Sequence, residues 1–222
     1  MTDYKALNTV AYEHLKGMIY SGELEYGTIY SETKLAAQLS ISRTPMRDAL
    51  NRLAQERYID ILPNRGFMRH KPNRADIIEA YHVRMMIEGY CAKIVARHYP
   101  AEPKAQETVR RMEAALEGQK ALLDDTAQYS ITQFWLDDLD FHKALLQYMN
   151  ISALNLQYDS FMHIFMPHHI IATNQVHRHY TTLVEHAAII DALKSRDPVR
   201  VEAAIRAHLD SGLAVHSVKP EE

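Results

Sequence analysis

An aspartate and a histidine four residues apart, Asp138 and His142, are well spaced in this chain for binding a metal ion. Residues four apart share one face of a helix, so the carboxylate and the imidazole can reach the same ion. Eleven of the thirteen histidines lie in residues 76–222, and His186 and His208 each fall on the inward stripe of a predicted helix. These side chains could equally form a polar network inside a helical core, and the spacing alone leaves both alternatives open.

Residues 42–53 contain a second candidate group, because a helix start signal there precedes one apolar and one basic face. Ser42 is typical of an N-cap. The apolar stripe repeats at three- and four-residue steps and consists of Met46, Ala49, Leu50 and Leu53. The other face carries Arg43, Thr44 and Arg47, which suit phosphates and base edges in the major groove of DNA. An ordinary solvated helix face is the alternative.

The segments on either side of this helix favour DNA binding. Residues 31–39 predict a short helix, and only three residues separate it from the next one, as in a helix-turn-helix. Residues 58–62 and 67–70 are β-prone and enclose a turn, which predicts a hairpin. Arg65 and Gly66 lie at the tip of this predicted wing, where the backbone can approach DNA closely.

Residues from about 10 to 70 resemble the winged helix-turn-helix of the GntR family of bacterial transcription regulators. The matching motifs include Ser31-Glu32 with Leu35-Ala36, Ser42-Arg43-Thr44-Pro45-Met46-Arg47-Asp48-Ala49-Leu50, and Arg65-Gly66. The resemblance implies that Arg43, Thr44 and Arg47 contact the operator from the recognition helix. It also implies that Gly66, at the tip of the wing, enters the minor groove.

Composition and charge agree with a protein that binds DNA at one end. A chain of 222 residues with 47% apolar residues suits two modest domains or one large one, and the single Cys91 excludes an internal disulfide framework. Residues 1–75 hold 11 basic and 8 acidic side chains, whereas residues 76–222 hold 14 and 20. The chain contains no long apolar run or signal-peptide pattern. We therefore expect a soluble, cytoplasmic protein without a membrane partner.

The predicted fold class is mainly α, with a winged helix-turn-helix and small β-hairpin wing followed by an all-α bundle of about six helices. Residues 1–70 are the predicted DNA-binding domain, residues 71–75 a linker, and residues 76–222 a helical effector-binding and dimerisation domain. The six predicted helices are 75–98, 103–123, 127–148, 152–172, 179–195 and 198–216. No glycine-rich phosphate loop is present.

Residues 76–216 resemble the FCD (FadR C-terminal) ligand-binding domain that often follows this kind of winged helix. The motifs are Val83-Arg84 with Ile87-Glu88, Asp138-x-x-Phe141-His142, Glu185-His186-x-x-Ile189 and Ala207-His208-Leu209. The resemblance implies that Asp138, His142, His186 and His208 bind a divalent metal, for which zinc and nickel suit the donors. The metal would then bind the carboxylate of a small organic acid.

Two parts of the second domain leave alternatives open. Arg84 stands where the family often points an arginine toward the effector, but it could instead form a surface ion pair with Glu88. Residues 163–179 are rich in histidine where many members have arginines. Those histidines could line an effector pocket, form a second metal site, or be solvated.

The function predicted from these features is that of a homodimeric DNA-binding transcriptional regulator, a repressor, acting on a two-fold operator. A small carboxylate-containing metabolite would control it by favouring one arrangement of the C-terminal bundles. A helical metalloenzyme with an appended DNA-binding domain is the rival class. A bundle di-iron enzyme would need two Glu-x-x-His motifs, and only Glu79-Ala80-Tyr81-His82 fits.

Overall fold

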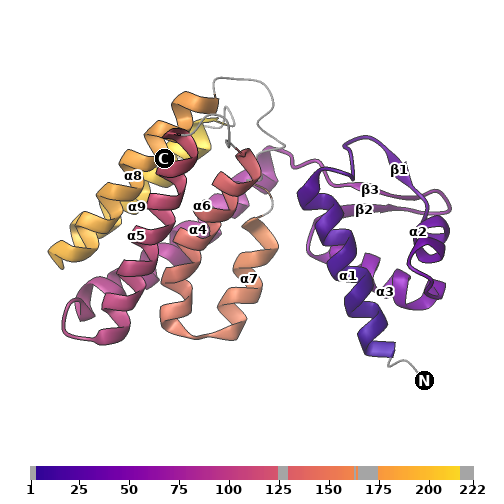
Figure 1. Cartoon of the computed structure of the whole chain (residues 1–222), viewed down its shortest axis with the longest axis horizontal. Helices are drawn as coiled ribbons and strands as arrows, with labels where there is room; N and C mark the ends of the chain where they lie inside the picture. Colours follow the sequence, from indigo (N-terminus) through magenta and orange to yellow (C-terminus); the bar gives the residue numbers. More distant parts are fainter. Residues whose placement is uncertain (1–3, 125–129, 163, 165–174, 216–222) are drawn as a thin grey trace. The chain divides into compact units, whose positions relative to one another are not determined.

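The chain divides into two compact units, Met1–Lys71 and Pro72–Glu222. The computed structural model describes residues 4–124, 130–162, 164 and 175–215 of the chain, and Figure 1 labels its elements. Within the described residues, helices and a small sheet make up the N-terminal unit, and the C-terminal unit is helical. The predicted fold class is therefore confirmed.

The N-terminal unit has a helical core. Its helices are α1 (Tyr4–Ser21), α2 (Glu32–Gln38) and α3 (Arg43–Gln55), with α1 and α2 both packed on α3. The stripe predicted for α3 is buried in that core, at no more than 3% exposure. The core side chains of α1 and α3 include Leu15, Ile19, Met46, Leu50 and Leu53. Burying this stripe leaves the basic face of α3 outward.

The sheet contains one strand more than the predicted hairpin. Strands β2 (Ile59–Leu62) and β3 (Gly66–Arg69) form the hairpin, and β1 (Ile29–Tyr30) pairs with the far edge of β3. Two residues are too few to show the alternation that identifies a strand in a sequence. Gly66 has a φ of +122°, and a Cβ built there would lie 2.1 Å from the Tyr30 carbonyl oxygen. The close approach of β1 therefore requires glycine at this position.

Side-chain caps begin several helices, but one predicted cap is wrong. Ser31 accepts a hydrogen bond from the Lys34 amide at the start of α2. Ser42 occupies the N-cap position of α3 with extended backbone, yet its hydroxyl makes no capping hydrogen bond. An N-cap side chain bonds the amide of the second or third helical residue, and here the third is Pro45, which has no N–H.

Six helices are described in the C-terminal unit. They are α4 (Arg74–His98), α5 (Pro103–Asp124), α6 (Ile131–Met149), α7 (Ser152–Met162), α8 (Gln175–Ser195) and α9 (Pro198–Val215). The most extensive packing joins α5 to α6, α4 to α9 and α8 to α9 (Figure 1). Asn73 begins α4 with a capping box that it forms with Asp76.

Two predicted helix starts differ from the observed ones by four residues, and the predicted end of a third helix falls outside the described residues. Helix α6 begins at Ile131 rather than at 127, because the Ser130 hydroxyl caps the Gln133 amide. Helix α7 ends at Met162, and the rest of the predicted helix 152–172 lies outside the described residues apart from 164. Helix α8 begins at Gln175 rather than at 179, since polar residues there interrupt the apolar pattern without ending the helix.

Polar side chains interrupt the apolar core of the C-terminal unit. Each is at most 6% exposed, although such groups are rarely buried without partners. They include Arg84, Glu88, Gln119, His142, His186 and His208. Within the described part of the chain, no helix is both long and apolar enough to cross a membrane.

Candidate metal site and DNA-binding surface

The four residues predicted to bind a metal lie together inside the C-terminal bundle. Helix α6 supplies Asp138 and His142 one turn apart, while α8 supplies His186 and α9 supplies His208. The Nε2 atoms of His142 and His208 are 3.1 Å apart. Asp138 Oδ1 lies 3.4 Å from His186 Nε2, and Asp138 Oδ2 lies 3.9 Å from His142 Nε2. One nitrogen of each ring lies within 4.8 Å of the other two.

Each histidine has a polar partner at its other ring nitrogen, Nδ1. The three pairs are His142 with Glu88 Oε2 at 2.8 Å, His186 with Gln119 Oε1 at 2.9 Å, and His208 with Glu185 Oε2 at 2.9 Å. Within the described part of the chain, Glu88 Oε2 and His142 Nδ1 make no hydrogen bond, so their contact is mainly electrostatic. The partners come from α4, α5 and α8, and the sequence analysis predicted none of them as a contact of a histidine Nδ1 atom.

Glu88 is the centre of a buried charge cluster on α4. Arg84 Nε donates to Glu88 Oε1 at 2.6 Å, and the Tyr158 hydroxyl donates to the same oxygen at 2.8 Å. Burial alone would raise the pKa of the Glu88 carboxyl, but the charge of the neighbouring Arg84 guanidinium holds it well below its usual range. The ion pair of Arg84 with Glu88 therefore exists, although it lies inside the bundle and not on a helix surface.

Glu185 carries a second arginine beside the cluster. Arg178 Nη1 donates to Glu185 Oε2 at 2.8 Å, and this is the oxygen that contacts His208 Nδ1. The side chains of Arg178 and Glu185 are 19% and 14% exposed, so this ion pair lies at the edge of the buried region. Sequence reasoning grouped Arg178 only with the histidine-rich segment.

The local environment keeps two of the histidines neutral. Burial holds the pKa of His186 and of His208 well below the usual value, and neighbouring histidines and arginines lower both further. A metal binds the neutral form of imidazole, so these rings are ready for coordination without losing a proton at pH 7.

The donor set fits a divalent transition metal. Two donors that are each about 2.1 Å from one ion lie roughly 3.0–3.4 Å apart, depending on the coordination angle. The contact between His142 and His208 and that between His186 and Asp138 fall in this range. His186 Nε2 is also buried, and none of the described residues is a hydrogen-bond partner for it. One carboxylate and three imidazoles suit zinc or nickel.

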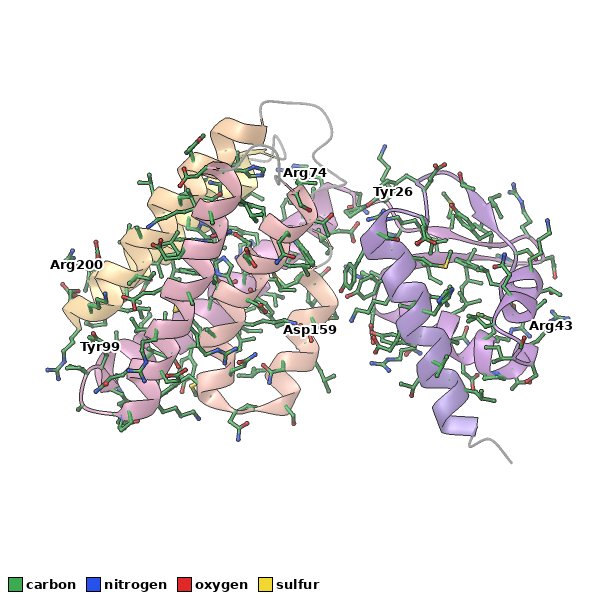
Figure 2. All side chains as sticks on the ribbon, viewed as in Figure 1. Tyr26, Arg43, Arg74, Tyr99, Asp159 and Arg200 are labelled. Atoms are coloured by element: carbon green, nitrogen blue, oxygen red, sulfur yellow. The ribbon has the colours of Figure 1, made fainter. Side chains whose placement is uncertain are left out.

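Exposed arginines mark the basic face of α3 in the N-terminal unit. The side chains of Arg43 and Arg47 are 67% and 68% exposed, and Arg43 is labelled in Figure 2. Their Nε atoms lie 3.8 and 4.0 Å from the Glu32 carboxylate at the start of α2. Thr44 is exposed beside them. These side chains are accessible to a ligand without any rearrangement of the core.

The wing borders the same face. A groove of about 350 Å³ is lined by Arg43, Arg47 and Glu32 on one side, and by Arg65 and Gly66 on the other. Arg65 is exposed in the hairpin turn, whereas Gly66 is only partly exposed. The structure thus brings the predicted recognition helix and wing tip to one groove within this unit.

Most of the histidine-rich segment lies outside the described residues, including His163, His168 and His169 and the side chain of His177. His179 is described, and its ring stacks on Phe134 with centroids 4.2 Å apart. Burial lowers the pKa of His179.

Family models identify both units. The model described as bacterial regulatory proteins, gntR family, matches residues 7–68, and the FCD domain model matches residues 79–211. The chain therefore belongs to the GntR family of DNA-binding transcriptional regulators, and its C-terminal unit is an FCD domain.

Individual relatives agree with this assignment. The chain is 27% identical to the gluconate operon transcriptional repressor of Bacillus subtilis over 208 residues, covering 90% of this chain and 81% of that one. It is 26% identical to the transcriptional repressor NanR of Klebsiella aerogenes over 239 residues, covering 93% and 84%. The fold matches a GntR regulator structure from Rhodococcus sp. RHA1 with a TM-score of 0.76, at 24% identity and 96% and 99% coverage. Family and relatives identify a regulator, so the metalloenzyme alternative is not retained.

Proposed function

We propose that this regulator is a homodimeric repressor of a two-fold operator, controlled by a small carboxylate ligand that binds through a divalent metal. Asp138, His142, His186 and His208 would hold the metal. The observation that carries the proposal is the convergence of one carboxylate and three buried imidazoles at distances that one ion can span.

The balance of charge around the cluster supports an anionic ligand. Arg84 offsets Glu88, and Arg178 offsets Glu185. Among the described residues of the cluster, this leaves the carboxylate of Asp138 to oppose a doubly charged ion. A net positive site in a buried region favours a ligand with a negative group. A bound metal would act as a Lewis acid that attracts the ligand carboxylate.

Arg84 is the proposed protein contact for the effector. Its guanidinium lies close enough to His186 and His208 to lower the pKa of both rings. Its Nε is engaged by Glu88, which fixes the plane of the guanidinium. A rigid fork of this kind suits a carboxylate better than a flexible ammonium does.

On the DNA side, Arg43, Thr44, Arg47, Arg65 and Gly66 are the proposed operator contacts. A two-fold dimer would present two copies of this surface to two half-sites. The effector must bind the DNA-competent and the released arrangements with different affinities in order to control the equilibrium. Repression is supported by the relatives, which are named as repressors.

Metal analysis of the full-length, tag-free protein tests the site. We expect about one zinc or nickel ion per chain, lost in His142→Ala and in His186→Ala. Asp140→Asn is the matched control, because Asp140 is an exposed carboxylate on the same helix, α6. If the wild-type protein takes up no metal from excess zinc or nickel, the four residues are a polar core network.

The effector class is tested by thermal shift with a panel of small carboxylates. Gluconate belongs in the panel, because one relative is named for a gluconate operon. We expect stabilisation of the metal-loaded protein and none of the metal-free protein. Equal stabilisation of both forms would contradict binding through the metal.

A further inference from the structure

The three histidines of the cluster are supported by three different helices behind the proposed ligand atoms. Glu88 on α4 and Gln119 on α5 are fully buried, and the side chain of Glu185 on α8 is 14% exposed. All three place an oxygen at an Nδ1 atom. None of the three is among the four residues predicted to bind the metal.

We propose that Glu88, Gln119 and Glu185 are positioning residues that hold each histidine in the form that binds metal. This inference rests on the proposed metal site. In a neutral imidazole one nitrogen carries the proton and the other a lone pair. A partner at Nδ1 that can only accept a hydrogen bond places the proton there and leaves the lone pair on Nε2.

Gln119 is the informative case, because an amide can either donate or accept. Its own Nε2 donates to the Phe134 carbonyl oxygen at 3.4 Å, which turns its Oε1 toward His186. The amide oxygen can only accept, so His186 must carry its proton on Nδ1. The bare Nε2 of His186 then faces Asp138, and no residue in the described ranges donates a hydrogen bond to it.

The two glutamates favour the same form of His142 and His208, Glu185 through a hydrogen bond and Glu88 through the electrostatic attraction of its carboxylate for a proton on Nδ1. Each carboxylate is ion-paired to an arginine, Glu88 to Arg84 and Glu185 to Arg178, and an ionised carboxylate can only accept. With both protons on Nδ1, the Nε2 lone pairs of His142 and His208 face one another at 3.1 Å. Two lone pairs at this distance repel each other unless a cation lies between them, so the outer residues prepare the cluster for a positive ion.

The metal affinity of full-length variants tests this role. Zinc affinity is measured by competition with a chromophoric chelator, beside the unfolding midpoint of the metal-free protein. Gln119→Leu and Glu185→Leu remove an acceptor at nearly constant volume, and each is expected to weaken zinc binding about 10- to 100-fold. Gln119→Glu restores an acceptor and is expected to bind zinc at least tenfold more tightly than Gln119→Leu.

Glu113→Leu is the matched control for these variants. Glu113 on α5 pairs with Lys194 on α8 at 2.5 Å, so it joins the same two helices, but both side chains are 40% exposed, whereas the three histidines are buried. Zinc affinity equal to wild type is expected for this variant. Glu88 is left intact, because its removal would strand the buried charge of Arg84.

The outcomes separate this inference from the proposed function. Wild-type zinc affinity in both Gln119→Leu and Glu185→Leu, in a protein that binds zinc, would overturn the positioning role alone. The positioning role is also overturned if Glu113→Leu weakens zinc binding as much as Gln119→Leu and Glu185→Leu do. A zinc affinity of Gln119→Glu no higher than that of Gln119→Leu would overturn it as well. A wild-type protein that binds no zinc or nickel would overturn the proposed metal site and this inference with it.

Discussion

Each unit of this protein pairs arginine with glutamate, but the two arrangements differ in burial and in distance. In the N-terminal unit, Arg43 and Arg47 are about two-thirds exposed and lie 3.8 and 4.0 Å from Glu32. In the C-terminal unit, Arg84 and Glu88 are 7% and 0% exposed, with 2.6 Å between Nε and Oε1. The arginines of the first arrangement are loosely held and exposed beside a Glu32 side chain that is 18% exposed, whereas both partners of the second arrangement are tightly held and buried.

This difference determines what each arginine can do. Exposed ion pairs contribute roughly 0–1 kcal/mol and are screened by salt, so Arg43 and Arg47 can exchange Glu32 for a DNA phosphate at little cost. A buried charge that loses its partner is far more expensive, so Arg84 stays with Glu88. The same two residue types therefore give an exchangeable contact in one unit and a fixed framework in the other.

Replacing Arg84 by methionine should produce the largest effect. The change leaves the Glu88 carboxylate buried without its arginine, and we expect the free energy of unfolding to fall by about 3–5 kcal/mol. Urea denaturation of the metal-free protein measures this free energy of unfolding. The chain has a single tryptophan, Trp135, buried on α6, so its fluorescence reports on the C-terminal unit.

The same substitution at Arg43 is the control for this comparison. Arg43→Met removes an exposed arginine, so we expect a change within about 0.5 kcal/mol. Circular dichroism measures it, because Trp135 lies in the other unit. The double variant Arg84→Met, Glu88→Gln should recover part of the loss, since it removes both charges. Equal destabilisation by the Arg43 and Arg84 substitutions would abolish the distinction between the two arrangements.

Replacing Arg47 by alanine should affect DNA binding without affecting stability. If Arg47 makes a bidentate contact with a base, operator affinity should fall by about 1–3 kcal/mol, with the unfolding midpoint unchanged. The operator is first selected from a random duplex pool by the purified protein, and binding is then measured by fluorescence anisotropy at several salt concentrations. Lys34→Ala is the control, because Lys34 is exposed on α2 but does not line the groove. Wild-type affinity in Arg47→Ala would remove Arg47 from the DNA contacts.

Sequence periodicity predicted the main elements because each depends on its own residues. The apolar stripe of α3 and the hairpin of β2 and β3 are local features of this kind. Strand β1 was missed because its two residues acquire their conformation only by pairing with β3. Gly66 was interpreted as a wing-tip glycine, but its contact with the Tyr30 carbonyl oxygen depends on that missed strand.

Only the part of the candidate site that depends on residues close together in the sequence could be predicted from that sequence alone. Asp138 and His142 are recognisable as a pair because one helix face joins them, and the resemblance supplied His186 and His208. Gln119 could not be found, because it lies on an ordinary amphipathic helix and meets His186, 67 residues away, only through packing of α5 on α8. Outer partners of this kind have no fixed spacing, since any helix packed behind the site can supply them.

Replacing Glu32 by glutamine should give the smallest effect and the sharpest test of the exposed arrangement. The Glu32 carboxylate competes with DNA phosphates for Arg43 and Arg47, so neutralising it should raise operator affinity by at most about 1 kcal/mol. The gain should shrink as salt rises, because screening weakens exposed charges first.

Asp48→Gln is the control, since Asp48 is an exposed acidic residue on α3 that does not line the groove. Weaker binding in Glu32→Gln would mean that Glu32 orients the two arginines for DNA, and the N-terminal arrangement would then be a fixed framework like that of Arg84 and Glu88.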